Sequence, residues 1–422
     1  MATVQDIKSA IVDREEEITQ KWNTENIIER TLLEKAKGFI SSDAALIVTG
    51  VRRCGKSLFA VMLGENSKYA YVNFEDERLG LEAAELNKVL EAVYSLKGEV
   101  ELLILDEIQN ITGWEKFVAR IIPRQKVVIT GSNARLLSKE LATYLTGRHI
   151  NVTLFPFSFQ EYLSFNQIKV NPNLTRDIAL VKNELNRYLS TGGFPLVAKL
   201  GNIFLMETYR DILERDIIQR YRIRQVKAFK DLAKYVVSNT SSEFSYNKLK
   251  SIFNIKSVHT VKNYVSYLEN AYLIFVLERF SFKLKNQVLA PKKLYCIDTG
   301  LAGAVSFTFS ENHGKVMENA VAIELQRRVA SALGTELYYW KDHQQREVDF
   351  ILKEEKKVTQ LIQVCYDLSD PFTKEREVKS LVEASIELRC KNALVITSEF
   401  EGEEKHGNLV IKFIPLWRWL LE

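Results

Sequence analysis

The stretch from Gly50 to Ser57 constrains the fold of this chain more than any other. It reads GVRRCGKS, which matches the G-x-x-x-x-G-K-[ST] pattern of a phosphate-binding loop, and it stands between two apolar runs. The pattern predicts a buried strand, a glycine-rich turn and a helix whose N-terminus faces an anion. The residues expected to bind ATP are Gly50, Val51, Arg52, Arg53, Cys54, Gly55, Lys56, Ser57 and Leu58.

Four polar side chains are expected to carry the chemistry at this loop. Lys56 would reach the β- and γ-phosphates, and the hydroxyl of Ser57 would bind Mg²⁺. About fifty residues further on, an apolar run ends in Asp106 and Glu107. Because ligands bind beyond the carboxyl ends of parallel strands, we expect Asp106 to hold Mg²⁺ and Glu107 to polarise the attacking water.

A further strand, expected at residues 126–131, is followed by Ser132 and Asn133. Polar side chains at this position would lie beside the γ-phosphate and sense it, with Asn133 the better candidate. Arg148 is a candidate arginine finger for the nucleotide of a neighbouring subunit, because the charge that develops during phosphoryl transfer favours an inserted guanidinium. Two alternatives stay open: Arg148 forms a surface salt bridge, or Arg135 takes the role.

Six segments of the first half resemble a widespread archaeal and bacterial family of AAA-type ATPases. They are GVRRCGKS, VNFEDERL, LDEIQNITGWEKF, VVITGSNARLLSKELATYLTGRH, LFPFSFQEYL and YLSTGGFPLV. The resemblance implies an α/β chain: an AAA+ P-loop ATPase with a parallel sheet, a winged helix-turn-helix, and a C-terminal restriction-endonuclease-like α/β domain. It also implies ATP hydrolysis with Glu107 as catalytic glutamate, ATP and Mg²⁺ as cofactors, and a homo-oligomer, with a hexameric ring as one form. The three domains are expected at residues 1–200, 201–301 and 302–422.

The middle of the chain is strongly basic. Residues 220–293 carry fifteen Lys or Arg against four Asp or Glu, whereas the net charge of the whole chain is +4. Such asymmetry indicates an anionic partner. Helices are expected at residues 229–238, 245–253 and 257–270, and their short spacing is typical of a helix-turn-helix.

The third of these helices would present hydroxyl, amide and cationic groups to phosphates and base edges. Strands expected at residues 272–282 and 293–297 would be joined by a basic wing. The residues expected to bind DNA are His259, Thr260, Lys262, Asn263, Lys283 and Lys285. DNA is the favoured partner, and docking of a protein by the same segment stays the alternative.

The C-terminal part resembles a PD-(D/E)xK nuclease core, with Glu318 in an expected helix and Asp349 in an expected strand. That core holds Mg²⁺ between two carboxylates and places a lysine beside it. At the corresponding positions of the next strand this chain has Gln363 and Cys365. These residues supply neither the negative charge of a carboxylate nor the positive charge of a lysine. We therefore expect a degenerate nuclease-like domain that docks a nucleic acid or a subunit, with a purely structural role as the alternative. Three nearby side chains are candidates to substitute: Lys356, Lys357 and Asp367.

Composition argues against several other classes of protein. The four cysteines show no C-x-x-C spacing, which argues against a zinc site or a disulfide framework. No stretch approaches the roughly eighteen consecutive apolar residues of a membrane span, and residues 1–8 do not open a signal peptide. We expect a cytoplasmic protein that acts away from membranes.

These observations lead to one main hypothesis and two alternatives. The chain is expected to be a Mg²⁺-dependent ATPase that binds, remodels or translocates on duplex or branched DNA. The first alternative is an ATP-dependent switch that docks a protein partner. The second is an ATP-dependent nuclease, which Gln363 and Cys365 disfavour.

Overall fold

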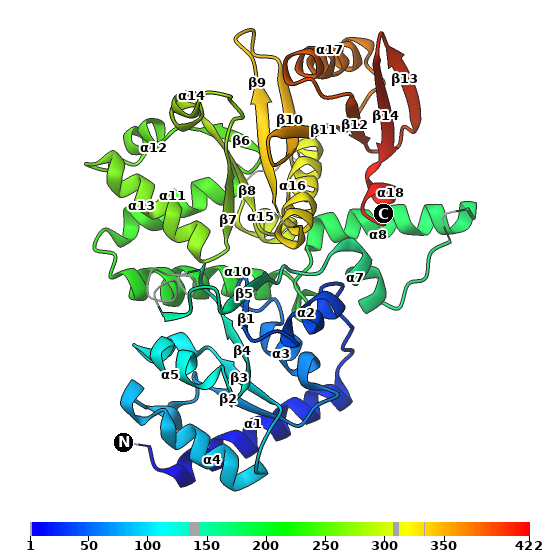
Figure 1. The fold of residues 1–422 in the computed structure, drawn as a ribbon. Helices are drawn as coiled ribbons and strands as arrows, with labels where there is room; N and C mark the ends of the chain where they lie inside the picture. The colour runs from blue at the N-terminus through cyan, green and yellow to red at the C-terminus, as the bar shows by residue number, and fades with distance from the viewer. Residues whose placement is uncertain (1, 135–143, 172, 307–311, 333) are drawn as a thin grey trace. The chain divides into compact units, whose positions relative to one another are not determined.

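The computed structural model describes residues 2–134, 144–171, 173–306, 312–332 and 334–422 (Figure 1). The chain forms two compact units, one of Met1–Phe155 with Asn270–Tyr272, and one of Pro156–Glu269 with Leu273–Glu422. Among the described residues, no helix has both the length and the apolar character that crossing a membrane requires.

The first unit is built on a five-stranded parallel sheet in the order β2-β3-β4-β1-β5. Its strands are β1 (Ala45–Thr49), β2 (Tyr69–Asn73), β3 (Leu102–Asp106), β4 (Lys126–Gly131) and β5 (His149–Thr153). Strands β1 and β3 are buried along their whole length, as expected where helices cover both faces of a parallel sheet. The predicted parallel sheet is confirmed.

The helices of this unit complete its core. They are α1 (Val4–Thr24), α2 (Leu33–Ile40), α3 (Lys56–Gly64), α4 (Asn87–Lys97) and α5 (Trp114–Ile121), with short 3-10 turns at Glu77–Leu79, Ala83–Glu85 and Ile108–Asn110. Ile7 and Ile11 of α1 lie in the same buried cluster as Ile47 of β1 and Leu105 of β3. The core therefore fixes the end of β3, where the acidic pair lies.

The second unit contains two sheets. The smaller is antiparallel, in the order β6-β8-β7, with strands β6 (Ser242–Phe244), β7 (Ile274–Leu277) and β8 (Lys292–Cys296). The larger is mixed, in the order β13-β14-β12-β11-β10-β9. Its strands are β9 (Thr335–Lys341), β10 (Glu347–Glu354), β11 (Lys357–Cys365), β12 (Asn392–Thr397), β13 (Gly402–His406) and β14 (Leu409–Pro415).

Helices surround these two sheets. They are α7 (Phe159–Phe165), α8 (Thr175–Thr191), α9 (Val197–Leu200), α10 (Asn202–Asp211) continued by a π-helical segment (Ile212–Gln219), α11 (Val226–Ser238), α12 (Tyr246–Ile252), α13 (Val258–Asn270), α14 (Leu284–Leu289), α15 (Thr299–Val305), α16 (His313–Ser331), α17 (Pro371–Leu388) and α18 (Leu416–Trp419). The three helices predicted in the basic middle are present as α11, α12 and α13. The predicted alternation of strands and helices in the C-terminal part is also present.

The connection expected to form a basic wing differs from the prediction in two respects: it contains a helix, and Lys292 is not exposed. The short helix α14 stands between β7 and β8, because residues 284–289 contain no glycine or proline that would break a helix. Lys292, expected in the wing, is buried in β8 and forms an ion pair with Glu278.

Candidate nucleotide site

The predicted phosphate-binding loop leaves β1 at Gly50 and enters α3 at Lys56. Gly50 has a φ of 146°, and a Cβ atom there would collide with the main-chain oxygen of Leu154. Gly55, which precedes the first residue of α3, has a φ of 99°. Both positions need glycine. The backbone amides of this turn and the N-terminus of α3 form the kind of site that binds phosphate.

Lys56 is held over this loop. Its side chain is largely buried, and its ammonium donates to the main-chain oxygens of Gly50 at 3.2 Å and Val51 at 3.0 Å. Arg52 forms an ion pair of 3.1 Å with Glu75, which follows β2. Of the remaining predicted residues, Val51, Arg53 and Cys54 lie in the loop and Leu58 lies in the first turn of α3.

Asp106 is the last residue of β3 and is buried. The Tyr71 hydroxyl, from β2, donates to one oxygen of its carboxylate, and the Thr130 hydroxyl, from β4, donates to the other. Burial raises the pKa of Tyr71 well above its ordinary value, and the charge of Asp106 adds to the rise, so Tyr71 remains a donor. Ser57, the other predicted Mg²⁺ ligand, lies in the first turn of α3, which begins at the carboxyl edge of the same sheet.

Glu107 has an unusual backbone conformation. Its φ is 55°, in the left-handed region that residues other than glycine seldom adopt, and its N–H donates to the main-chain oxygen of Thr130 at 3.2 Å. The side-chain amide of Gln109 donates to its carboxylate. Burial raises the pKa of the Cys54 thiol, and the charge of Glu107 contributes to that rise, so the carboxylate lies within electrostatic reach of the loop.

The predicted sensor residues follow the strand that separates the acidic pair from the loop. Ser132 and Asn133 come directly after β4, which lies between β3 and β1 in the sheet, and both are buried. Both residues therefore lie at the carboxyl edge of the sheet, where the phosphate-binding loop also begins.

Arg148 is not brought to the loop of its own chain. It is exposed and precedes β5, and its main-chain oxygen accepts the N–H of Ala45, the first residue of β1, at 2.9 Å. Because β1 and β5 are parallel, Arg148 stands at the opposite end of the sheet from Gly50. The competing candidate, Arg135, lies outside the described residues.

The predicted DNA-binding residues lie on two elements of the second unit. On α13, His259 and Lys262 are exposed, and Thr260 and Asn263 are half-buried. The Lys262 ammonium lies 5.5 Å from the centre of the Tyr246 ring on α12. Lys283 directly precedes α14 and Lys285 lies within it, and both are exposed.

Glu318 and Asp349, the predicted residues of a nuclease-like core, lie around the ammonium of Lys293. Lys293 is not among the residues predicted for that core. The Lys293 ammonium, on β8, lies 2.9 Å from carboxylate oxygens of both Glu318, on α16, and Asp349, on β10. It lies 2.6 Å from Glu347, and only 4% of the Lys293 side chain is exposed. Burial raises the pKa of Glu318 to about 7, although Lys293 and a hydrogen bond from Tyr295 oppose the rise.

Gln363 joins this cluster and Cys365 does not. The Asp349 N–H donates to the Gln363 side-chain oxygen at 3.2 Å, and the Gln363 amide donates to Glu377 at 2.7 Å. The Cys365 sulfur instead contacts the main-chain oxygen of Asp367, and burial raises the pKa of its thiol to about 11.

The cation of this cluster is Lys293, and none of the three candidates named from the sequence takes its place. Lys356 lies in the turn between β10 and β11, Lys357 begins β11, and the Asp367 carboxylate accepts hydrogen bonds from Ser369. Among the residues that the structure describes, no group of three or more His, Cys, Asp or Glu is arranged to hold a metal ion. These carboxylates therefore do not fit Mg²⁺, because an ammonium occupies their centre.

Comparison with known proteins places the loop and the acidic pair in an AAA domain. The model of an AAA domain family matches residues 42–163, and models of two domains of unknown function, DUF8612 and DUF4143, match residues 182–312 and 313–419. The uncharacterized protein MJ1544 of Methanocaldococcus jannaschii is 36% identical over 396 residues, which cover 89% of this chain and 88% of that protein. The chain belongs to the family of this archaeal protein.

A bacterial protein is also similar to this chain. An uncharacterized protein of Haemophilus influenzae is 27% identical over 410 residues, covering 92% of this chain and 97% of the relative. Among solved structures, the replication initiator DnaA bound to AMPPCP and single-stranded DNA matches 56% of this chain and 86% of its own, at 15% identity and a TM-score of 0.25. That structural likeness is slight. The AAA domain itself supports nucleotide binding and ATPase activity.

Four residues of this AAA domain site escaped sequence reasoning: Arg30, Tyr71, Gln109 and Thr130. The buried Arg30 guanidinium donates to the main-chain oxygens of Cys54 at 3.1 Å and Phe155 at 2.7 Å, which ties the loop to the segment after β5. Nothing in the local sequence marks Arg30. Tyr71 and Thr130 lie near the carboxyl ends of β2 and β4, so the rule that such ends converge could have found them.

Proposed function

We propose that the chain is a Mg²⁺-dependent ATPase that acts on DNA. The ATPase part rests on one observation: the loop after β1 and the acidic pair at the end of β3 lie at the same edge of one parallel sheet, with only β4 between the two strands. A phosphate-binding turn, a hydroxyl and a buried carboxylate are then available to one nucleotide.

The chemistry of these side chains fits Mg²⁺ and ATP. Ser57 and Asp106 offer the hard oxygen donors that Mg²⁺ prefers, and the ion would neutralise charge on the phosphates when bound. The loop amides and Lys56 bind and orient the phosphates. Glu107, whose carboxylate is oriented by Gln109, accepts the proton of the attacking water.

Ser132 and Asn133 are proposed to contact the γ-phosphate, and Arg148 is proposed to act on the nucleotide of a neighbouring subunit in a homo-oligomer, of which a hexameric ring is one form. The location of Arg148 at the far end of the sheet supports action between chains. Mixing the Lys56→Ala and Arg148→Ala variants tests this, because each oligomer could then contain an intact loop facing an intact arginine. Recovery of part of the ATPase activity is expected, and a mixture as inactive as its components would exclude the role.

The DNA part rests on the basic segment and on α13. His259 and Lys262 stand exposed on one helix of a closely spaced group of three, in a segment whose basic residues outnumber its acidic ones by eleven. We propose that residues 201–301 act as a winged helix-turn-helix with α13 as its recognition helix, and that residues 302–422 form a nuclease-like domain without cleavage activity.

The test is the ATPase rate in the presence of single-stranded, duplex and four-way DNA, together with DNA affinity as a function of salt. We expect DNA to raise the rate, and affinity to fall steeply with salt because counterions are released. Lys262→Glu should weaken DNA binding, whereas Lys412→Glu, a charge reversal at an exposed lysine on β14, should not. An ATPase that no DNA stimulates, and that binds none, would refute the DNA part and leave the ATPase part standing.

A further inference from the structure

The short helix α14 carries apolar side chains that the fold leaves uncovered. Leu284 is 72% exposed, Leu289 73% and Val288 59%, and Phe282, just before the helix, is 72% exposed. None of the six residues of α14 is buried. We refer to these four side chains as the α14 patch. Folded proteins seldom expose adjoining large apolar side chains, and such groups mark interaction sites.

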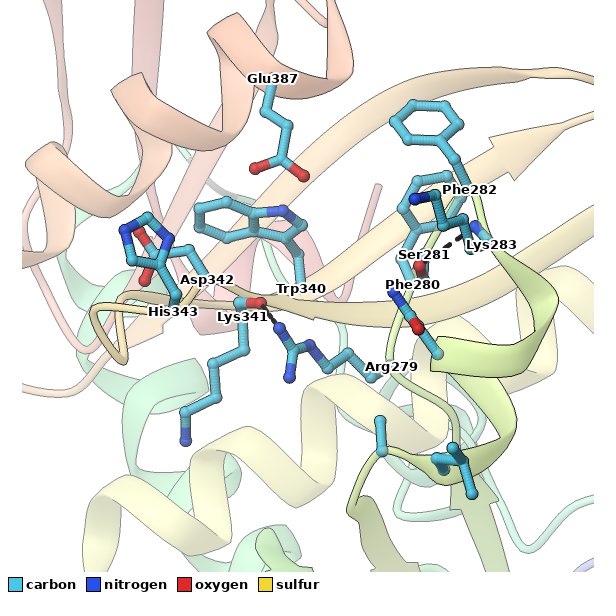
Figure 2. A pocket seen from close by; sticks show the side chains of 13 residues that line it. Arg279, Phe280, Ser281, Phe282, Lys283, Trp340, Lys341, Asp342, His343 and Glu387 are labelled. Carbon is cyan, nitrogen blue, oxygen red and sulfur yellow. Dashed lines mark hydrogen bonds between the residues drawn. The ribbon is translucent and has the colours of Figure 1, made fainter.

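A pocket of about 620 Å³ opens beside the patch (Figure 2). One wall is formed by the chain from Arg279 to Ala290, and the other by Trp340 and the start of the turn after β9, with Glu387 of α17 above it. Phe280 and Phe282 pack edge to face across 5.1 Å. Binding pockets have volumes of roughly 300–1,000 Å³, so this one can accept large side chains of a bound segment.

Main-chain hydrogen bonds hold the aromatic wall in place. The Phe280 N–H donates to the main-chain oxygen of Tyr339 at 2.7 Å, and the Tyr339 N–H donates to that of Glu278 at 3.1 Å. The Arg279 guanidinium donates to the main-chain oxygen of Lys341. The chain before α14 is therefore fixed to β9, and the pocket is formed before any partner arrives, which lowers the entropic cost of binding.

Cations flank the apolar surface. Lys283 and Lys285 alternate with Phe282 and Leu284 along the chain, and neither lysine forms an ion pair within the part of the chain that the structure describes. A partner that covers the α14 patch must therefore supply apolar groups, and it must also supply negative charge to pair with the two lysines.

We propose that the α14 patch and the adjoining pocket dock an acidic segment of a partner protein, with large apolar side chains of that segment inserted beside Trp340. A nucleic acid fits less well. The aliphatic side chains of Leu284, Val288 and Leu289 offer neither hydrogen bonds nor a stacking face to bases. This site is separate from the DNA-binding face proposed on α13.

The experiment selects ligands from a phage-displayed library of random 16-residue peptides against the full chain. Enriched peptides are expected to combine Asp or Glu with Leu, Phe or Trp. A synthetic copy of one such peptide is then titrated by fluorescence anisotropy against the parent chain, the double variant Leu284→Ser and Leu289→Ser, and the double variant Lys283→Glu and Lys285→Glu. We expect both to weaken binding at least about ten-fold, since centrally placed apolar and charged groups dominate such interfaces.

The control variant is Phe372→Ser on α17. Phe372 is 82% exposed, so its replacement removes a large exposed apolar side chain from a different place. Binding of the peptide to this variant should equal binding to the parent. Failure to enrich any acidic apolar peptide, or equal binding by all variants, would overturn the proposal. Loss of binding to an oligo-dT in the two double variants, without peptide binding, would assign the surface to nucleic acid instead.

Discussion

Replacing Lys293 by methionine should destabilise the second unit, and the loss should depend on pH. Methionine keeps most of the side-chain volume but removes the ammonium that lies within 3 Å of Glu318, Glu347 and Asp349. Three carboxylates then face one another, and among the described residues Lys341, 3.1 Å from Glu347, is the cation that remains paired with them. Because removing one partner of a buried ion pair leaves an uncompensated charge, the expected cost is about 3–5 kcal/mol.

The sign of the pH dependence follows from Glu318. Its pKa in the folded protein is about 7, above its ordinary value, so its contribution to stability is present at low pH and is lost as pH rises through 7. Lys293 lowers that pKa, and its removal moves the pKa further up. The variant should therefore lose more stability at pH 8 than at pH 5, where Glu318 is protonated in parent and variant alike.

Thermal unfolding followed by circular dichroism at pH 5 and pH 8 measures the effect, with an expected fall in the midpoint at pH 8 on the order of 10 °C. The control is Lys353→Met, whose partner Glu336 is half exposed and whose loss should cost at most about 1 kcal/mol. Adding Glu318→Gln to Lys293→Met should restore part of the loss. Equal unfolding midpoints of variant and parent at pH 8, or a loss independent of pH, would show that Lys293 does not balance these charges.

The remaining predictions concern the nucleotide site. Glu107→Gln should bind ATP as the parent does but hydrolyse it roughly 100-fold more slowly or worse, as single-turnover kinetics would show, and undiminished turnover would remove Glu107 from its role. Gln109→Ala should lower kcat about ten-fold without weakening ATP binding, because the carboxylate is no longer oriented. Tyr71→Phe should raise the Mg²⁺ concentration for half-maximal hydrolysis roughly ten-fold, and an unchanged Mg²⁺ titration would refute its support of Asp106. Gly50→Ala should abolish ATP binding and destabilise the fold by at least about 1 kcal/mol, whereas Gly38→Ala, in open space on α2, should be tolerated in a denaturant titration.

The geometry of the candidate nucleotide site was largely predictable because its signals are local. The strand before the loop is a continuous apolar run, and the glycines at positions 50 and 55 stand where the backbone adopts conformations that favour glycine. The sequence did not reveal Arg30, whose main-chain partners lie 24 and 125 residues away. Contacts over such distances in the chain leave no periodic pattern to recognise.

The basic middle was less predictable, because a count of charges does not tell which of them are exposed. Lys292 and Lys293 contribute to the count, yet both are buried and neutralised by carboxylates. Lys283 and Lys285 remain exposed, but Lys285 lies in α14 and Lys283 directly precedes it, beside an uncovered apolar surface. Their surroundings, which only the fold defines, change the expected partner.

The location of Lys293 has a consequence for how the C-terminal half can be divided. The family models place a boundary between residues 312 and 313, so Lys293 falls on one side and Glu318 and Asp349 fall on the other. A fragment that begins at this boundary would carry the carboxylates without their counter-ion. We therefore expect the stretch matched by DUF4143 to be less stable as an isolated fragment than within the whole chain. Its electrostatic balance is completed by a strand that precedes it.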